Sequence, residues 1–170
     1  MKRPRSLKSR ALQLLALREQ SRVELRRKLL AHARAVEADP SAPAAAAGDC
    51  APDAQAQVDA VLDWLEANRF LSAERFVESR VRVRAERFGN VRIRHELAQH
   101  EVVLSSDAEQ GLVDSELARA RAVRARKFPQ PPATPAESAR QARFLGARGF
   151  SSDVIRRVLR EAAQADAAGG

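Results

Sequence analysis

Histidine, cysteine and serine are the residue types that most often bind metals or act as nucleophiles, and this sequence holds few of them in useful positions. His95 and His100 lie five residues apart, whereas two metal ligands on one helical face need a spacing of about three or four. Cys50 is the only cysteine, so no disulfide forms within the chain. No phosphate-binding glycine loop and no nucleophile motif is present. We therefore expect no catalytic residue, no metal and no cofactor.

Charged side chains are the remaining source of chemistry. Many carboxylates alternate with arginines at helical spacing, as Glu78 does with Arg82, and such pairs are solvated helix-surface groups rather than general acids or bases. The chain has 30 Lys and Arg against 22 Asp and Glu, which gives a net charge of +8. This excess favours polyanionic partners such as nucleic acid or nucleoprotein. A general bias toward arginine in the genome would produce the same composition, so both interpretations stay open.

One arginine-containing pattern occurs three times. Each copy has a Ser or Gly that can open a helix, an apolar residue four positions later that is followed at once by arginine, and a leucine four positions after the apolar residue. The copies span residues 21–29, 89–97 and 151–159. Internal similarity of this kind is typical of repeat architectures. The recurring arginines, Arg26, Arg94 and Arg156, share either a binding role or a structural role in bridging adjacent helices.

The elements that carry these residues are predicted to be helices throughout. Ala, Leu, Arg and Glu are strong helix formers and Tyr is absent, so the sequence predicts an all-α fold. Capping boxes open helices at Ser21 and Ser106, Ser72 caps another, and Thr134 with Pro135 opens a fourth. Apolar spacing predicts further helices over residues 7–19, from Val58, over 91–101 and from about 152. We expect Gly89 and Asn90 to form a tight turn because both tolerate unusual backbone angles.

These helices group into tandem three-helix, helix-turn-helix-like repeats. A basic N-terminal tail over residues 1–8 precedes the first repeat, residues 9–71, which contains a mobile Ala/Pro-rich loop at about 34–57. The second repeat spans 72–128, a Pro-rich connector 129–135, the third repeat 136–163 and a tail 164–170. The third repeat is truncated to two helices. No apolar run approaches the roughly 20 residues of a membrane-spanning helix, and we expect a cytoplasmic protein.

Several arginines and lysines lie where they could contact a partner. Three flank the apolar stripe of the helix after Ser72, and others end the helix that follows residue 106. Their guanidinium groups suit phosphates and carboxylates because the planar fork donates two hydrogen bonds at once. The alternative is a solvated helix edge whose aliphatic stems cover the core. The candidate partner-binding or DNA-binding residues are Arg26, Arg80, Arg84, Arg87, Arg92, Arg94, Arg124, Lys127, Arg143, Arg148 and Arg156.

Three segments resemble the RecX regulatory proteins of bacteria. They are residues 21–29, residues 75–77 with 89–97, and residues 140–145 with 148–155, so the likeness spans nearly the whole chain. The Ala/Pro insertion between Ala33 and Ala54 and the Pro-rich connector after Phe128 depart from the family pattern. Both departures lie between helices and affect the geometry between repeats.

The resemblance implies an elongated, curved arrangement of repeats that binds the RecA protein and the RecA–DNA filament. Members of this family restrain RecA in homologous recombination, DNA repair and the SOS response by lowering its ATPase, strand-exchange and coprotease activities. We therefore expect a monomeric, non-enzymatic regulator with no membrane partner. The alternative is a stand-alone basic helical protein that binds single- or double-stranded DNA without RecA. Loss of DNA affinity with rising salt would characterise that alternative.

Overall fold

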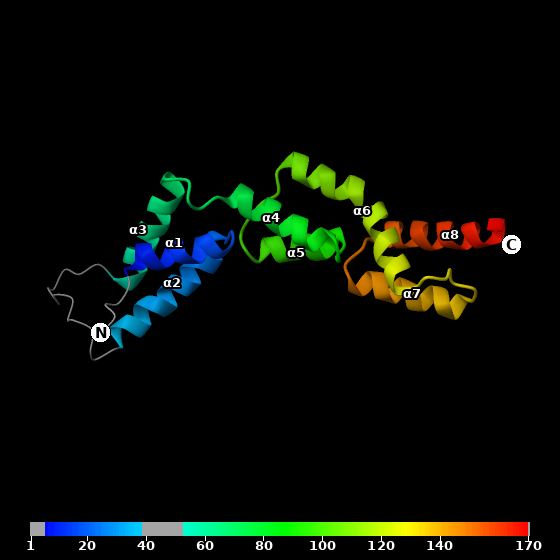
Figure 1. The fold of residues 1–170 in the computed structure, drawn as a ribbon, viewed down its shortest axis with the longest axis horizontal. Helices are drawn as coiled ribbons and strands as arrows, with labels where there is room; N and C mark the ends of the chain where they lie inside the picture. The colour runs from blue at the N-terminus through cyan, green and yellow to red at the C-terminus, as the bar shows by residue number, and fades with distance from the viewer. Residues whose placement is uncertain (1–5, 39–52, 170) are drawn as a thin grey trace. The chain divides into compact units, whose positions relative to one another are not determined.

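A computed structural model describes residues 6–38 and 53–169 of the chain, and its side chains up to residue 164. Within those residues every regular element is an α-helix, which confirms the predicted fold class. The helices pack as two compact units, Met1–Phe76 and Val77–Gly170. The boundary falls inside α4 (Ala73–Ala85), a few residues from the predicted start of the second repeat. Figure 1 traces the helices in chain order. The three-repeat division and the elongated, curved arrangement stay predictions.

The first unit is a three-helix core. Its helices are α1 (Leu7–Leu17), α2 (Arg22–Glu37) and α3 (Ala54–Ala67). Leu25 and Leu29, the two apolar anchors of the repeated pattern, are fully buried against Leu62 and Leu65 of α3. The Ser21 hydroxyl accepts a hydrogen bond from the Glu24 backbone N–H at 3.1 Å, so this helix starts as its capping sequence predicts.

The helix ends in this unit differ from the predicted ones. α2 continues to Glu37 instead of dissolving near Arg34, and α3 begins at Ala54 instead of near Val58. Apart from Val36, both extensions consist of Ala, Gln and Glu, which favour helix without contributing bulky side chains to an apolar stripe. α1 ends at Leu17, two residues before the predicted Glu19. Residues 39–52 of the predicted mobile loop lie outside the described part of the chain.

The second unit is organised around α6. It contains most of α4, then α5 (Asn90–Ala98), α6 (Ser106–Lys127), α7 (Pro135–Ala147) and α8 (Ser152–Gly169). The 22 residues of α6 give it a length of about 33 Å, so its two ends can serve different neighbours. α6 packs on α5, and also on α7 and α8, which lie alongside one another in Figure 1.

The C-terminal half of α6 supplies a third helix to the last repeat. Ala120 and Val123 of α6 form one core cluster with Leu145 of α7 and with Phe150 and Val158 from the end of the chain. The sequence predicts only the two helices after the connector, because the apolar pattern of residues 112–123 is assigned to the second repeat alone. A long helix with apolar residues on more than one side can pack in two repeats at once, as α6 does with α5 and with α7 and α8.

Three other helix ends depart from the sequence predictions. Ser105 rather than Ser106 caps α6, since its hydroxyl accepts from the Ala108 N–H at 3.3 Å. α5 ends at Ala98 instead of Glu101, which has a φ of 54° that no helix continues through. α8 runs to Gly169, past the predicted start of the tail, because its last residues are mostly alanine. The Thr134 cap with Pro135 in the first turn is confirmed.

Candidate functional site

Two interhelical turns of the second unit, the one between α4 and α5 and the one between α7 and α8, cross each other through backbone contacts. Gly89, before α5, donates its N–H to the carbonyl of Arg148 at 2.9 Å, and Val91 donates to the carbonyl of Gly149 at 3.1 Å. A Cβ atom on Gly89 would lie only 2.2 Å from the Gly149 oxygen. Gly89 has a φ of −82°, so its glycine serves close approach and not the unusual turn angle that the sequence suggested.

At Gly149 a glycine is needed both for close approach and for the backbone angle. Its φ is +79°, a left-handed conformation that side chains disfavour, and a Cβ there would lie 2.5 Å from the Cβ of Arg92. The two glycines therefore allow the chain segments around residues 87–92 and 147–150 to touch, although they are about 60 residues apart in sequence.

The crossing gathers three predicted site residues. Arg148 donates from Nη1 to the carbonyl of Arg87 at 3.2 Å, and Arg92 donates from Nη1 to the carbonyl of Ala147 at a long 3.5 Å. Each of these two guanidinium groups also lies over an aromatic ring, Arg92 at 4.3 Å from the centre of Phe88 and Arg148 at 4.6 Å from the centre of Phe144. Such contacts orient an arginine while leaving donors available for a ligand.

Further cations surround a small cleft beside the crossing. The cleft has a volume of about 180 Å³, and its walls include Arg87, Arg126, Lys127 and Arg148. The first three are exposed and have no side-chain partner among the described residues. Glu86 is the one carboxylate that lines it, and Val123 and Phe144 supply apolar surface.

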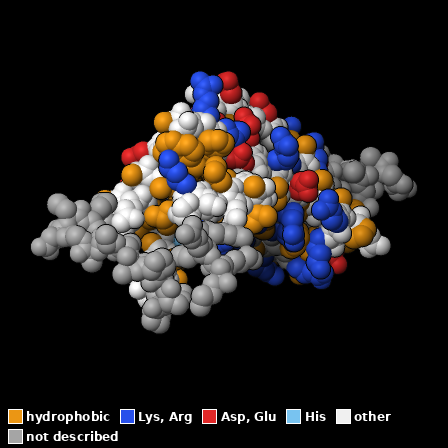
Figure 2. All heavy atoms as spheres, turned by 60° about the vertical axis from the view of Figure 1, so that its left-hand side comes forward, with side chains coloured by type: hydrophobic (Ala, Val, Ile, Leu, Met, Phe, Trp, Pro, Cys, Tyr) orange, Lys and Arg blue, Asp and Glu red, His pale blue; other side chains and the backbone are white. Residues whose placement is uncertain are grey.

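We call the set formed by Arg87, Arg92, Arg126, Lys127 and Arg148 the crossed-turn surface. Closely spaced cations with unused donors attract phosphates and carboxylates, and each charge-assisted hydrogen bond to such a group is stronger than a neutral one. On the face drawn in Figure 2, Lys and Arg side chains are also more prominent than Asp and Glu, in keeping with the net charge of +8.

Arg80 and Arg84 lie in a different environment. Both pair with Glu96 of α5, at 3.2 Å and 2.9 Å, so this carboxylate offsets part of their charge. Arg84 also lines a groove of about 640 Å³ together with Arg92, His95 and His100. The ion pairs hold α4 against α5, which fits the structural reading of these two arginines better than the binding reading.

The three recurring arginines do not share one role. Arg26 of α2 forms a bidentate pair with Asp59 of α3, at 2.7 Å and 3.0 Å. Arg94 of α5 pairs with Glu109 of α6, again from one helix to the next. Arg156 pairs with Asp153 within α8 and is 74% exposed. Bridging of adjacent helices therefore accounts for the first two arginines but not for the third.

The remaining predicted residues lie around the connector and α7. Arg124 donates to the Gln141 side chain at 2.9 Å and to the Gln130 carbonyl at 2.7 Å, and thereby ties the connector to α6 and α7. Arg143 is exposed and has no partner among the described residues.

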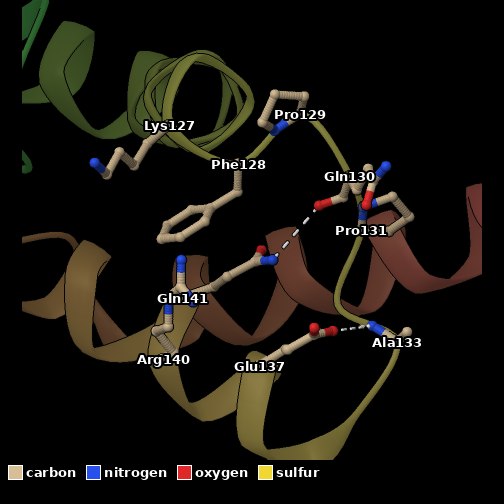
Figure 3. A pocket seen from close by; sticks show the side chains of 9 residues that line it. All are labelled: Lys127, Phe128, Pro129, Gln130, Pro131, Ala133, Glu137, Arg140 and Gln141. Atoms are coloured by element: carbon tan, nitrogen blue, oxygen red, sulfur yellow. Dashed lines mark hydrogen bonds between the residues drawn. The ribbon is translucent and has the colours of Figure 1, made fainter.

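A pocket of about 370 Å³ lies between the connector, the end of α6 and α7, and Figure 3 shows its lining. Phe128 points into it, with Arg140 at 5.3 Å from the ring centre. The Glu137 carboxylate points to the Ala133 backbone N–H and accepts a hydrogen bond from it at 2.8 Å. Gln141 donates to the Gln130 carbonyl at 3.5 Å, so the polar groups of this pocket bond mainly to one another.

Sequence reasoning missed two charged residues of α6 that support the crossing. Glu116, only 5% exposed, accepts from the Asn90 N–H at 3.0 Å and from the Ser151 N–H at 3.3 Å and hydroxyl at 3.1 Å. Arg119 donates to the Phe88 carbonyl at 2.7 Å and also to the Asn90 side chain. Burial lowers the pKa of the Arg119 guanidinium, and the charge of Glu116 opposes this shift.

One sequence signal could have identified Glu116. It occupies the position between Leu112 and Ala120 at a spacing of four, where the apolar stripe of α6 would otherwise hold a hydrophobic residue. An acid in such a position is buried and needs hydrogen-bond donors. Nothing in the sequence around Arg119 distinguishes it from its neighbours, because arginine recurs at several positions along this helix.

The cations of the crossed-turn surface have the hydrogen-bond donors that an anion needs. In the described part of the chain, no three His, Cys, Asp or Glu side chains come together in a way that could hold a metal ion. Among the helices of the described residues, none is long and apolar enough to cross a membrane.

Comparison with known proteins identifies one family. The family model described as RecX, third three-helix domain, matches residues 114–159, which begin just before the middle of α6 and include α7 and the first part of α8. The regulatory protein RecX of Leptothrix cholodnii is 50% identical over 157 residues, covering 91% of this chain and 88% of the relative. That of Ralstonia nicotianae is 45% identical over 165 residues, covering 95% and 91%.

A solved structure supports the fold. The crystal structure of RecX from Lactobacillus salivarius matches with a TM-score of 0.64 and covers 93% of this chain and 95% of its own. The two sequences are 16% identical, so this match supports only the arrangement of the helices. The start of the family match inside α6 agrees with the third helix that α6 contributes to the last repeat.

Proposed function

The chain belongs to the RecX family of regulatory proteins, and from this premise we propose that it binds RecA and the RecA–DNA filament and lowers RecA activity without catalysing a reaction. The affected activities would be ATP hydrolysis, strand exchange and coprotease activity, in recombination and the SOS response. A regulator of this kind acts by binding alone, so it needs cations and shape rather than a nucleophile or a metal.

The crossed-turn surface is the observation that carries this proposal. Three of its cations are exposed and without side-chain partners in the described part of the chain, namely Arg87, Arg126 and Lys127. The Arg148 guanidinium is oriented by its hydrogen bond to the Arg87 carbonyl. Most other arginines of the candidate set already have partners, as Arg26 has Asp59. A filament of recombinase on DNA displays phosphates and carboxylates at regular intervals. Cations without partners on a folded unit can bind such a target. Each weak contact raises the effective concentration for the next contact.

The direct test measures RecA ATP hydrolysis on single-stranded DNA while the purified chain is added. We expect turnover to fall as the chain approaches the amount of RecA, and the chain to sediment together with filaments. Unchanged turnover without a detectable complex would exclude the proposal.

A second function is supported by the same cations. The crossed-turn surface could bind DNA phosphates directly, in the absence of RecA. On that reading the affinity for DNA alone falls steeply with salt, with a log–log slope of about −0.7 per neutralised phosphate on single strands and −0.9 on duplex. Filament binding that greatly exceeds DNA binding at the same salt concentration would favour the first proposal over the second.

A further inference from the structure

Two crossing turns carry the basic surface, and both are attached to one buried carboxylate. Oε1 of Glu116 accepts hydrogen bonds from the backbone N–H of Asn90, at the start of α5, and of Ser151, directly before α8. Oε2 accepts from the Ser151 hydroxyl. Because the first N–H groups of a helix have no partner within that helix, one carboxylate here serves the openings of two helices at once.

Arg119, one turn further along α6, holds the other side of the first crossing turn. It donates to the carbonyls of Phe88 and Leu112, at 2.7 Å and 3.0 Å, and to the Asn90 side chain. Asn90 is 3% exposed, and its side-chain amide accepts from Arg119 and donates to the Leu112 carbonyl at 3.0 Å, while its backbone N–H donates to Glu116. The end of α4 and the start of α5 are therefore fixed to α6 by charged groups and not only by apolar packing.

The attached residues lie within three positions of the cations in the sequence. Arg87 precedes Phe88 by one position, Arg92 follows Asn90 by two, and Arg148 precedes Ser151 by three. The 3.2 Å hydrogen bond from Arg148 to the Arg87 carbonyl forms only if both turns keep their positions. We infer that Glu116 is a positioning residue that fixes the cations of the crossed-turn surface relative to one another, and so sets the affinity of this surface for a polyanion. This inference rests on the proposed role of the surface in binding.

In the described part of the first unit, the turn between α1 and α2 is held by other contacts and provides a control. At this turn, Gln20 donates to the Leu14 carbonyl at 2.6 Å and accepts from Lys28 at 2.8 Å, so residues of α1, α2 and the turn between them satisfy one another. Gln20 is 1% exposed, as buried as the Asn90 amide. Gln20→Ala therefore removes a buried turn contact of similar kind without touching the crossing at Gly89 and Gly149.

Four variants of the full chain separate positioning from stability. Glu116→Ala removes the acceptor, and Glu116→Gln keeps an acceptor oxygen for the two backbone N–H groups. Val158→Ala destabilises the same unit through its apolar core, where Val158 is 2% exposed. Gln20→Ala acts in the first unit. Dissociation constants are measured for the RecA filament and, without RecA, for a fluorescent 20-nucleotide oligo(dT), at a temperature where circular dichroism shows each variant folded.

We expect Glu116→Ala to weaken binding of both probes by about tenfold, the loss of roughly one charge-assisted hydrogen bond. Glu116→Gln should bind within about threefold of wild type, and Val158→Ala and Gln20→Ala should bind as wild type does. In an Arg148→Ala background the effect of Glu116→Ala should shrink, because the arginine that it positions is already absent.

Wild-type affinity in Glu116→Ala, or an equal loss in Val158→Ala, would overturn the inference, as would a full tenfold effect that persists without Arg148. The oligo(dT) arm does not involve RecA. If wild type fails to bind the filament, the proposed function fails, whereas the ranking of the variants on oligo(dT) still decides the role of Glu116.

Discussion

Gly89 is bonded to Arg148 across the turn crossing, and Arg148 in turn bonds back to the segment that precedes Gly89. The Gly89 N–H donates to the Arg148 carbonyl at 2.9 Å, and the Arg148 guanidinium donates back to the carbonyl of Arg87, two residues before Gly89. The backbone contact thus fixes the position of an arginine whose remaining donors are available to a ligand. The candidate site therefore depends on the fold at this point, because a change that separates the turns also moves the cations.

Replacing either crossing glycine by alanine should destabilise the second unit. In Gly89→Ala the new Cβ would lie 2.2 Å from backbone atoms that cannot rotate away, and Gly149→Ala adds the strain of a φ of +79°. We expect each change to lower the free energy of unfolding by about 2–3 kcal/mol, measured by urea denaturation.

Gly111→Ala is the matched control for these two variants. Gly111 lies within α6, and a Cβ there meets no atom within 4 Å. Its replacement should raise the free energy of unfolding by about 0.5–1 kcal/mol through helix propensity. If Gly89→Ala behaved like Gly111→Ala, the backbone crossing described above would not exist in solution.

The Glu24 carboxylate should make the first unit sensitive to acid. Burial by itself raises the pKa of Glu24, but hydrogen bonds and charges from Arg18 and Lys28 outweigh it and lower the pKa from 4.5 to about 2. A depressed carboxyl pKa adds stability that is complete above pH 4.5 and is lost as the pH falls toward 2. A pKa shift of this size corresponds to roughly 3 kcal/mol of folding free energy, because each pKa unit is worth about 1.4 kcal/mol. Solvent screens the interaction little, since the Glu24 side chain is 7% exposed.

Glu24→Gln isolates this contribution from that of the other carboxylates. The variant should be less stable than wild type at pH 7, and the difference in free energy of unfolding between the two proteins should shrink as the pH approaches 2. Thermal unfolding at pH 7, 4 and 2.5 measures it. A difference that stays constant over this range would mean that Glu24 is not held ionised by Arg18 and Lys28.

Arg94 should act through Glu109 rather than through a ligand. Their side chains are 43% and 39% exposed, so the pair is worth at most about 1 kcal/mol. Arg94→Glu should lower the free energy of unfolding by roughly that amount, and Arg94→Glu combined with Glu109→Arg should restore it. We expect filament affinity to stay within about threefold of wild type in both variants. A loss of affinity in both would assign Arg94 to the binding surface, as the repeated sequence pattern also allowed.

The sequence was informative where local spacing decides the outcome. Leu25 and Leu29 lie on the buried face that their spacing predicts, and Ser21 caps α2 as its neighbours suggest. Helix ends shifted where alanine-rich segments such as residues 54–57 favour helix without an apolar stripe. These features depend on residues a few positions apart, which is the range over which sequence patterns carry information.

Long-range pairing could not be predicted in the same way. Whether an arginine is available depends on an acid far away in sequence, as Arg26 depends on Asp59. The purpose of Gly89 depends on Gly149, and that of Glu116 on Ser151, 35 residues later. Three similar arginines therefore looked equivalent, although only packing determines which of them bridge helices.

We propose that the cations of the crossed-turn surface carry the regulation of RecA. Arg87→Glu with Lys127→Glu reverses two exposed cations that have no side-chain partner among the described residues. Arg27→Glu with Arg82→Glu does the same to two exposed arginines that line neither the cleft nor the crossing. Each pair changes the net charge by the same amount, so general electrostatic attraction is matched between the two variants.

The deciding measurement is RecA ATP hydrolysis on single-stranded DNA as a function of the concentration of wild-type chain or of each double variant. We predict that wild type and Arg27→Glu with Arg82→Glu inhibit at similar concentrations, whereas Arg87→Glu with Lys127→Glu needs at least about tenfold more protein. Equal inhibition by the two charge-matched variants would contradict the assignment of this surface.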